Sequence, residues 1–288
     1  MGQPQNKRIE GTKLSLSRKG FDSSAGGISS PIIEDRFISL PIPESGSDCF
    51  YKDLRIDKYT GTVLDLIRQL GARQYSECHL DPILSPEIYG LDREKGWYPA
   101  FGQDEAAASH LMSTHQFREG DIFLFFGNFR KAHISADHKI SFKKGNDSFH
   151  AIYGFMEVGE IICPEDKSIV IDKKYANHPH VRMRGKNYYK SNSTVFLPAR
   201  KSKHGFSQTC GVFKYTEVLR LTSSLEKSKM RSWKLPVELS HLNFSYFQKN
   251  QTSNQLLAPG RGQELVADID QKVIDWIRNL IQNNLLIA

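Results

Sequence analysis

The chain has 288 residues, of which 39% are hydrophobic and 25% are charged, and this composition excludes a wholly disordered protein and a collagen-like fibre. Lysine and arginine number 39 against 32 acidic residues, so the net charge is +7. This excess of positive charge favours a polyanionic partner such as nucleic acid. The length allows about two domains, but the sequence contains no flexible linker. We therefore expect one compact domain over residues 13–288, and the alternative is two closely packed halves that meet near residue 118.

The four cysteines, Cys49, Cys78, Cys163 and Cys210, are widely separated, so they form no local zinc ribbon or thioredoxin-like motif. A chain of this size without a disulfide framework suits a reducing cytoplasm. The sequence has no apolar stretch typical of a signal peptide and no run of about 18 apolar residues. We therefore predict a cytoplasmic protein with no membrane span.

Predicted elements of the first third are, in chain order, a polar leader at 1–12, a strand at 13–17, a Gly/Ser-rich loop at 18–27, a strand at 37–40, a helix at 62–70 and an irregular stretch at 75–103. The remainder is predicted to contain a helix at 104–112, strands at 122–126, 151–158, 194–197 and 215–222, basic loops at 131–147 and 163–205, and a final helix at 271–286. This order predicts an α+β fold that is mixed and dominated by antiparallel strands, with peripheral helices and a C-terminal helix.

Two segments in the middle of the chain, 120–126 and 151–162, resemble a strand pair of the PUA-like barrels, the group that includes the ASCH and EVE domains. The resemblance implies a small barrel over about residues 118–222, with a pocket formed by the loops at one end. Members of this group typically bind RNA or modified bases in DNA, often holding a flipped base. Any antiparallel sheet with alternating burial would give the same local pattern.

A wider resemblance extends over about residues 13–285. It is carried by the segments 16–27, 79–82, 96–103, 120–130, 150–162, 178–180 and 262–264. Together they resemble the third family of nucleotide modification associated domains. The family implies a bacterial or phage protein connected with hypermodified DNA bases, and it brings no assigned reaction with it.

The loop that follows the first predicted strand is the best local candidate for a binding site. Arg18, Lys19 and the backbone N–H groups of a glycine-rich turn can contact a phosphate, with the hydroxyls of Ser17 and Ser23 beside them. Asp22 would then act as a base or orient a hydroxyl. The residue order matches neither a P-loop nor a dinucleotide fingerprint. The alternative is a wide turn in which Asp22 and the serines cap backbone groups.

Two pairs of polar residues have a spacing of two, which places both side chains of an extended pair on one face. They are His79 with Asp81, and His178 with His180. Three nitrogens and one oxygen would suit a metal ion, but nothing in the sequence brings the two pairs together, and nearby prolines favour loops. We therefore predict no metal site, and we expect these histidines to act as an acid, a base or a phosphate contact. The alternative is that these loop residues cap turns or form hydrogen bonds with the backbone.

Aromatic residues beside a polar one form a second binding candidate. Trp97, Tyr98 and Phe101 would stack on a base, and Gln103 would read its edge. The alternative is that these aromatic side chains fill the core. A binding cavity built from these candidates requires residues 18–22, 79–81, 101–103 and 178–180 to lie close together in the fold.

Basic residues elsewhere are candidates for contacts with a nucleic-acid backbone. Arg130 follows an apolar strand, and Arg182 lies in a stretch, 173–190, that interleaves cations with aromatic residues. A solvated basic loop is the alternative for that stretch. Glu264, before the last helix, either closes the pocket as a second acid or caps the helix.

These features predict a protein that binds a DNA nucleobase, expected to be a modified one, in an aromatic pocket and modifies or removes it. The catalytic candidates are Arg18, Lys19, Asp22, His79 and Asp81; the binding candidates are Ser17, Ser23, Trp97, Tyr98, Phe101, Gln103, Arg130, His178, His180 and Arg182. One alternative is a non-catalytic reader of modified bases in phage defence. Another is an enzyme that acts on free nucleotides or nucleotide-sugars. DNA or a nucleotide is the expected partner, whereas the cofactor and any protein partner stay open.

Overall fold

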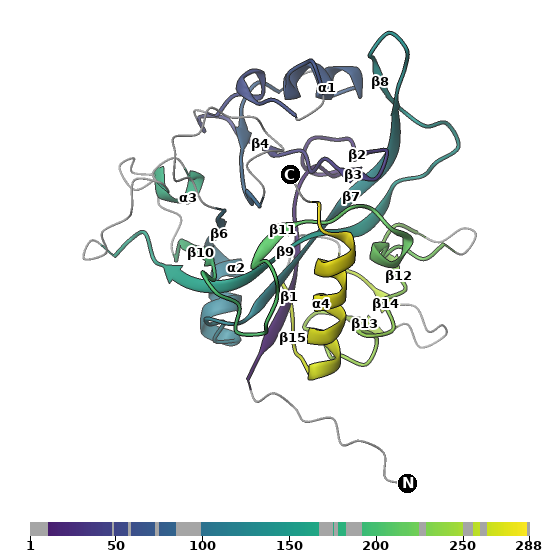
Figure 1. Cartoon of the computed structure of the whole chain (residues 1–288). Helices are drawn as coiled ribbons and strands as arrows, with labels where there is room; N and C mark the ends of the chain where they lie inside the picture. Colours follow the sequence, from purple (N-terminus) through teal and green to yellow (C-terminus); the bar gives the residue numbers. More distant parts are fainter. Residues whose placement is uncertain are drawn as a thin grey trace.

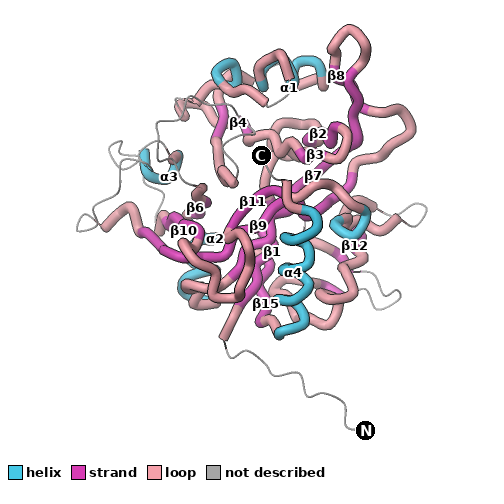
Figure 2. The backbone as a smooth tube through the Cα atoms, viewed as in Figure 1, coloured by secondary structure: helices cyan, strands magenta, loops and turns pink. Residues whose placement is uncertain are grey.

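The computed structural model describes residues 11–47, 49–56, 59–72, 75–84, 99–166, 175, 178–182, 192–224, 229–249, 256–259 and 264–286. Within these ranges strands occupy the middle of the molecule and helices lie around them (Figure 2). Residues 1–10 of the predicted leader at 1–12 lie outside the described residues.

A ten-stranded mixed sheet forms the centre (Figure 1). Its main path runs in the order β15 (Leu265–Asp268), β1 (Lys13–Arg18), β7 (Ile122–Ile134), β9 (Phe149–Ile162), β10 (Thr194–Pro198) and β6 (Phe101–Gln103), and β2 (Ser30–Ile33), β3 (Arg36–Phe37), β8 (Ile140–Phe142) and β11 (Cys210–Val212) join its sides. Strands β1 and β2 run parallel to β7, and the other pairings of this sheet are antiparallel. The predicted α+β class with mainly antiparallel strands is therefore confirmed.

The two longest strands, β7 and β9, form the backbone of this sheet. Their central residues are buried on both faces, which explains why the sequence there is a nearly continuous apolar run rather than an alternating one. The strands pair from Ile122 opposite Glu157 to Phe129 opposite Phe149, with a register shift between Phe125 and Phe126. The predicted loop at 131–147 is in part wrong, because β7 continues to Ile134 and β8 returns along it.

The sheet is open, so the predicted PUA-like barrel over residues 118–222 is not supported. In the described part of the chain, β15 and β6 lie at opposite ends of the strand path, and no pairing closes it. Strands β7 and β9 each change partner along their length, and the end strands β15 and β6 pair only with β1 and β10 among the described strands, whereas a closed barrel requires its end strands to pair with each other.

The C-terminal helix α4 (Gln271–Asn284) covers one face of the sheet beside β1 and β9 (Figure 1). The Asp270 carboxylate caps it by accepting a hydrogen bond from the backbone N–H of Val273. Its buried face includes Ile277 and Leu280, and Leu286 then donates its N–H to the Val212 carbonyl. The final predicted helix is confirmed.

The other helices are short: α1 (Val63–Gln69), α2 (Glu105–Ser109) and α3 (Pro179–Arg182). A capping box between Thr62 and Asp65 begins α1, as the sequence spacing requires. A π-helical turn, His110–Thr114, extends α2. The strand predicted at 215–222 is wrong, because Glu217–Leu219 forms a single 3-10 turn.

Two small ribbons complete the described structure. Strand β4 (Ile42–Pro43) pairs with β5 (Cys78–His79), and β12 (Ser232–Trp233) and β13 (Gln248–Lys249) flank β14 (Leu256–Leu257). The β4–β5 ribbon sets Ile42 opposite His79 and thereby holds the predicted His79/Asp81 pair beside the central sheet. Among the described helices, none has the length and hydropathy needed to cross a membrane.

Candidate functional site

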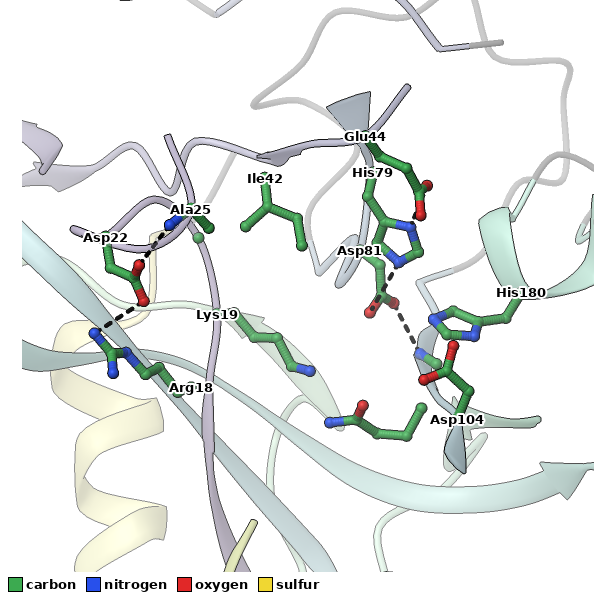
Figure 3. A pocket seen from close by; sticks show the side chains of 13 residues that line it. Arg18, Lys19, Asp22, Ala25, Ile42, Glu44, His79, Asp81, Asp104 and His180 are labelled. Carbon is green, nitrogen blue, oxygen red and sulfur yellow. Dashed lines mark hydrogen bonds and ion pairs between the residues drawn. The ribbon is translucent and has the colours of Figure 1, made fainter. Parts of the chain in front are cut away.

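A cavity of about 320 Å³ lies between the end of β1, the β4–β5 ribbon, β6 and the start of α3. Two walls face each other across it (Figure 3). We call the turn at residues 18–25, with Arg18 and Asp22, the turn wall. We call Glu44, His79, Asp81 and His180 the histidine wall. Lys19 lies between the two walls in this view.

The turn wall is held together by its own residues. The Asp22 Oδ1 atom accepts hydrogen bonds from the Ser24 N–H (2.6 Å), the Ser24 hydroxyl (2.7 Å) and the Ala25 N–H (2.8 Å). Its Oδ2 atom lies 2.9 Å from Arg18 Nη2. Burial alone would raise the pKa of Asp22, but the Ser24 hydroxyl and the Arg18 charge outweigh it and lower the pKa. This geometry matches the turn-capping alternative for Asp22.

A buried carboxylate, Glu264, lies beneath the cavity. Its two oxygens accept hydrogen bonds from the hydroxyls of Ser15 and Ser17, each at 2.8 Å, and from the side-chain amide of Gln103. The Lys19 ammonium lies 4.0 Å from Glu264 Oε1 and 4.2 Å from the centroid of the Phe101 ring. Glu264 therefore orients two cavity residues, and it does not cap the last helix.

The histidine wall brings the two spaced pairs of the sequence together. The Asp81 Oδ1 atom accepts hydrogen bonds from the Gly102 N–H (2.8 Å) and from His178 Nε2 (3.1 Å). His79 Nδ1 lies 2.8 Å from Glu44 Oε2. The rings of His79 and His180 meet edge to face, with centroids 5.0 Å apart.

The charges of this wall are set by burial and by these partners. Burial opposes ionisation of Asp81, but the His178 hydrogen bond and the neighbouring cations outweigh it and hold the Asp81 pKa far below its usual range. Burial also opposes protonation of His79, yet the Glu44 hydrogen bond and the Asp81 charge raise the His79 pKa overall. Burial lowers the pKa of His180 to about 3, so this ring is neutral.

The structure therefore brings seven of the fifteen predicted site residues to the lining of one cavity. They come from four distant stretches, and the cavity-lining ones are Arg18, Lys19, Asp22, His79, Asp81, Gln103 and His180. Ser17 and His178 lie directly behind this lining, each bonded to a carboxylate. The expected convergence of residues 18–22, 79–81, 101–103 and 178–180 is thus observed.

Phe101 does not face the cavity, where it was predicted to stack on a base. Its ring is fully buried and packs against Phe123, Phe125 and Phe196. Side chains alternate along β6, and Phe101 belongs to the core side of that strand. It cannot offer a face to a base, and the core-filling alternative holds for it.

The remaining candidates lie away from the cavity or outside the described residues. Ser23 is exposed in the turn, and the Arg130 guanidinium stacks 5.0 Å from the centroid of the Phe142 ring. Trp97 and Tyr98 are not among the described residues, and neither is the side chain of Arg182. Among the described lining residues no Phe, Tyr or Trp occurs, so the aromatic pocket stays a prediction.

The lining residues that the sequence analysis did not name as site residues include Glu44, Gly102 and Asp104. Nothing local marks Glu44, which follows a proline in an ordinary loop. Gly102 carries a readable signal, since a glycine inside a strand often marks a close approach. A Cβ atom at Gly102 would overlap the ring of His180. Asp104 was considered only as a helix cap, and its side chain makes no capping hydrogen bond to α2.

Comparison with known proteins gives one match. The family model described as nucleotide modification associated domain 3 matches residues 13–268. No curated protein and no solved structure shows a significant match. The matched range contains both walls of the cavity, and it covers most of the chain. The chain therefore belongs to the nucleotide modification associated domain 3 family.

Proposed function

We propose that the protein is an enzyme of nucleotide or nucleic-acid modification and that the cavity between the two walls is its active site. The observation that carries this proposal is the convergence of ionisable groups from distant segments on one cavity. The family assignment supports a nucleotide or DNA as the substrate class. The histidine wall is the reacting end, and Lys19 and Gln103 orient the substrate.

The size of the cavity favours a single nucleotide unit. A volume of about 320 Å³ lies at the lower end of the range for small-molecule pockets, which is roughly 300–1,000 Å³. Such a cavity suits one base or one nucleotide rather than a stretch of strand. A nucleobase from DNA would therefore have to leave its stack to enter.

The charge of the cavity determines which end of the nucleotide enters. Among the described lining residues four are carboxylic acids, Asp22, Glu44, Asp81 and Asp104, and two are cations. One of these cations, Arg18, already pairs with Asp22. This balance disfavours the phosphate cradle expected from the sequence of the turn. The base and sugar thus enter the cavity, and the phosphate stays at its mouth.

An enzyme explains this arrangement better than a reader of modified bases does. A reader needs stacking faces and hydrogen bonds along the edge of a base. The histidine wall instead combines the buried Asp81 carboxylate with two imidazoles, and a third imidazole, that of His178, lies behind it; these are groups that perform proton transfer and metal binding. Modification or removal of a base is therefore the reaction class that we propose.

Mass spectrometry of nucleosides tests this function. The full-length protein is incubated with unmodified DNA, with DNA rich in modified bases, and with free nucleotides. We expect a changed nucleoside or a released base with the wild-type protein, and none with Asp81→Asn. Ser23→Ala, an exposed change in the turn outside the cavity lining, is the matched control and keeps full activity. Binding without any product would instead support a reader.

A further inference from the structure

We propose that His79, Asp81 and His180 form a binding site for one divalent transition-metal ion. The three residues each offer a ligand atom, and these atoms lie within 4.8 Å of one another. All three residues line the cavity. Two imidazole nitrogens and one carboxylate oxygen are a donor set that zinc and iron(II) accept in proteins. The site lies in the cavity of the proposed function, but metal binding is measured without a substrate, so either proposal can fail alone.

Hydrogen bonds select which atoms remain for the ion. Glu44 engages Nδ1 of His79, so Nε2 is the nitrogen left to bind a metal. Gly102 and His178 engage Oδ1 of Asp81, so Oδ2 is the remaining oxygen. The distance between His79 Nε2 and Asp81 Oδ2 is 4.0 Å, which is too long for a hydrogen bond.

The partners behind these atoms are those that support metal ligands in proteins. A metal-binding histidine usually donates its other ring N–H to a carboxylate, which fixes the tautomer and raises the basicity of the ligand. Glu44 has this position behind His79. Asp81 is fixed in the same way by two donors to its outer oxygen. Without an ion, these inner atoms would be expected to form a direct hydrogen bond, but His79 Nε2 and Asp81 Oδ2 are within ion-pair distance only.

His180 is the third ligand of the proposed site, and the glycine in β6, Gly102, leaves space for its ring. Its ring packs over Gly102, where any larger residue would displace it. Among the described residues its ring has no hydrogen-bond partner. The residue is only 6% exposed, yet its ring nitrogens are not among the fully buried side-chain atoms that lack a partner, so they are accessible from the cavity. An ion between the three residues supplies that partner.

The spacing requires a small movement on binding. Two ligand atoms on a tetrahedral zinc ion with bonds of about 2.0 Å are about 3.3 Å apart. The three side chains therefore draw together from separations of up to 4.8 Å when the ion binds. Three protein ligands leave at least one position for water or substrate, which is typical of a catalytic site. When bound, the ion supplies a Lewis acid or an activated water, and its charge offsets the acidic lining.

A second group of candidate ligands lies close by and needs its own control. The Sγ atoms of Cys49 and Cys78 are 3.6 Å apart, and Cys78 precedes His79 in the chain. Neither cysteine is among the lining residues of the cavity, whereas His79, Asp81 and His180 all are. We therefore expect Cys49→Ser to keep full metal affinity.

Calorimetry and cobalt spectroscopy on the full-length chain test the site. After treatment with a chelator, the protein is titrated with Zn²⁺, Mn²⁺ and Co²⁺ in turn, and with Fe²⁺ without oxygen. We expect one equivalent of at least one ion, with loss of about 10–100-fold in affinity for Glu44→Gln, which removes only a supporting partner. Asp81→Asn and His180→Gln abolish this binding, whereas Cys49→Ser and the exposed His241→Gln do not change it.

Two results would overturn the site. One is the absence of binding by all four ions; the other is unchanged affinity in folded Asp81→Asn and His180→Gln. If those variants fail to fold, the wild-type protein is titrated with paramagnetic Co²⁺ and followed by NMR. A site at these residues requires the ring signals of His79 and His180 to broaden at lower Co²⁺ concentrations than those of His241. Metal binding without turnover would reject the proposed function alone, and turnover in the presence of chelator would reject the need for the ion.

Discussion

The two walls of the cavity contain similar residue types and use them differently. On the turn wall, Asp22 Oδ1 accepts hydrogen bonds from Ser24 and Ala25, and its Oδ2 pairs with Arg18. On the histidine wall, the inner atoms of His79 and Asp81 point at each other across 4.0 Å without a hydrogen bond. Residue type alone therefore does not separate scaffold from site. The difference lies in whether the polar atoms are satisfied by their own loop or left facing the cavity.

The largest expected effect is the loss of turnover in Asp81→Asn. The substitution keeps an acceptor for the Gly102 N–H but removes the negative charge from the histidine wall. We expect the rate of nucleoside modification to fall by about 10²–10³-fold, the usual effect of removing one preorganised electrostatic group from an active site. Nucleoside mass spectrometry over time measures this rate. A folded variant with the wild-type rate would remove Asp81 from the reaction.

Asp22→Ala, on the turn wall, should lower the stability of the fold and leave metal binding unchanged. It leaves the Ser24 and Ala25 donors and the Arg18 guanidinium without their acceptor, which typically costs about 1–3 kcal/mol in the free energy of unfolding. Urea denaturation measures this loss. We expect metal affinity to stay at the wild-type value. Full stability together with lost turnover would contradict the structural role of Asp22 in the turn wall and would make it catalytic, as predicted from the sequence.

A third buried polar group, His150, gives the fold a predictable pH dependence. Its Nδ1 accepts a hydrogen bond from Trp233 Nε1 at 3.0 Å, and burial lowers the His150 pKa to about 3. Because the unfolded histidine titrates near pH 6.5, the unfolded chain takes up the proton first as the pH falls. The free energy of unfolding therefore decreases below about pH 6.5, by up to about 1.4 kcal/mol per pH unit, until about pH 3.

Denaturation at several pH values compares the wild type with His150→Gln, which keeps an acceptor for Trp233. We expect the variant to be less stable near neutral pH and to lose less stability between pH 6.5 and 5. Equal slopes would show that His150 does not carry this dependence. His180 contributes in the same direction, since burial also lowers its pKa to about 3, so the difference between the two proteins is the quantity to measure.

The smallest effect is expected from Arg130, which the sequence analysis assigned to phosphate binding. Its guanidinium stacks on Phe142 and lies outside the cavity lining. We expect Arg130→Ala to leave the KM for a nucleotide substrate unchanged and to cost less than about 1 kcal/mol of stability. A large rise in the KM for DNA, with no change in the KM for free nucleotides, would instead indicate that a DNA strand binds along β7.

Local patterns were sufficient to predict much of the fold. The strand β1, the paired strands β7 and β9, and the helix α4 each follow from the hydrophobic pattern of their own residues. The closed barrel was wrong because closure depends on which strands meet, and no local pattern specifies that. The strand predicted at 215–222 failed because Glu217–Leu219 forms a 3-10 turn, which buries Leu219 and leaves Val218 exposed.

The site was predictable only in pieces. A spacing of two identified both His79 with Asp81 and His178 with His180, since it places both side chains on one face. Their meeting was not predictable, because the Asp81–His178 hydrogen bond joins residues 97 positions apart. Phe101 was misassigned for a related reason: a stacking ring and a core ring look alike in a sequence.

NMR of the histidine rings tests most directly whether the cavity binds a nucleotide at the histidine wall. Ring ¹H–¹⁵N spectra of the full-length protein are recorded while a nucleoside 5′-monophosphate is added, with and without Zn²⁺. We predict that the signals of His79 and His180 shift with the added nucleotide, while that of the exposed His241 does not. Binding that leaves His79 and His180 unchanged would contradict the assignment of this cavity as the active site.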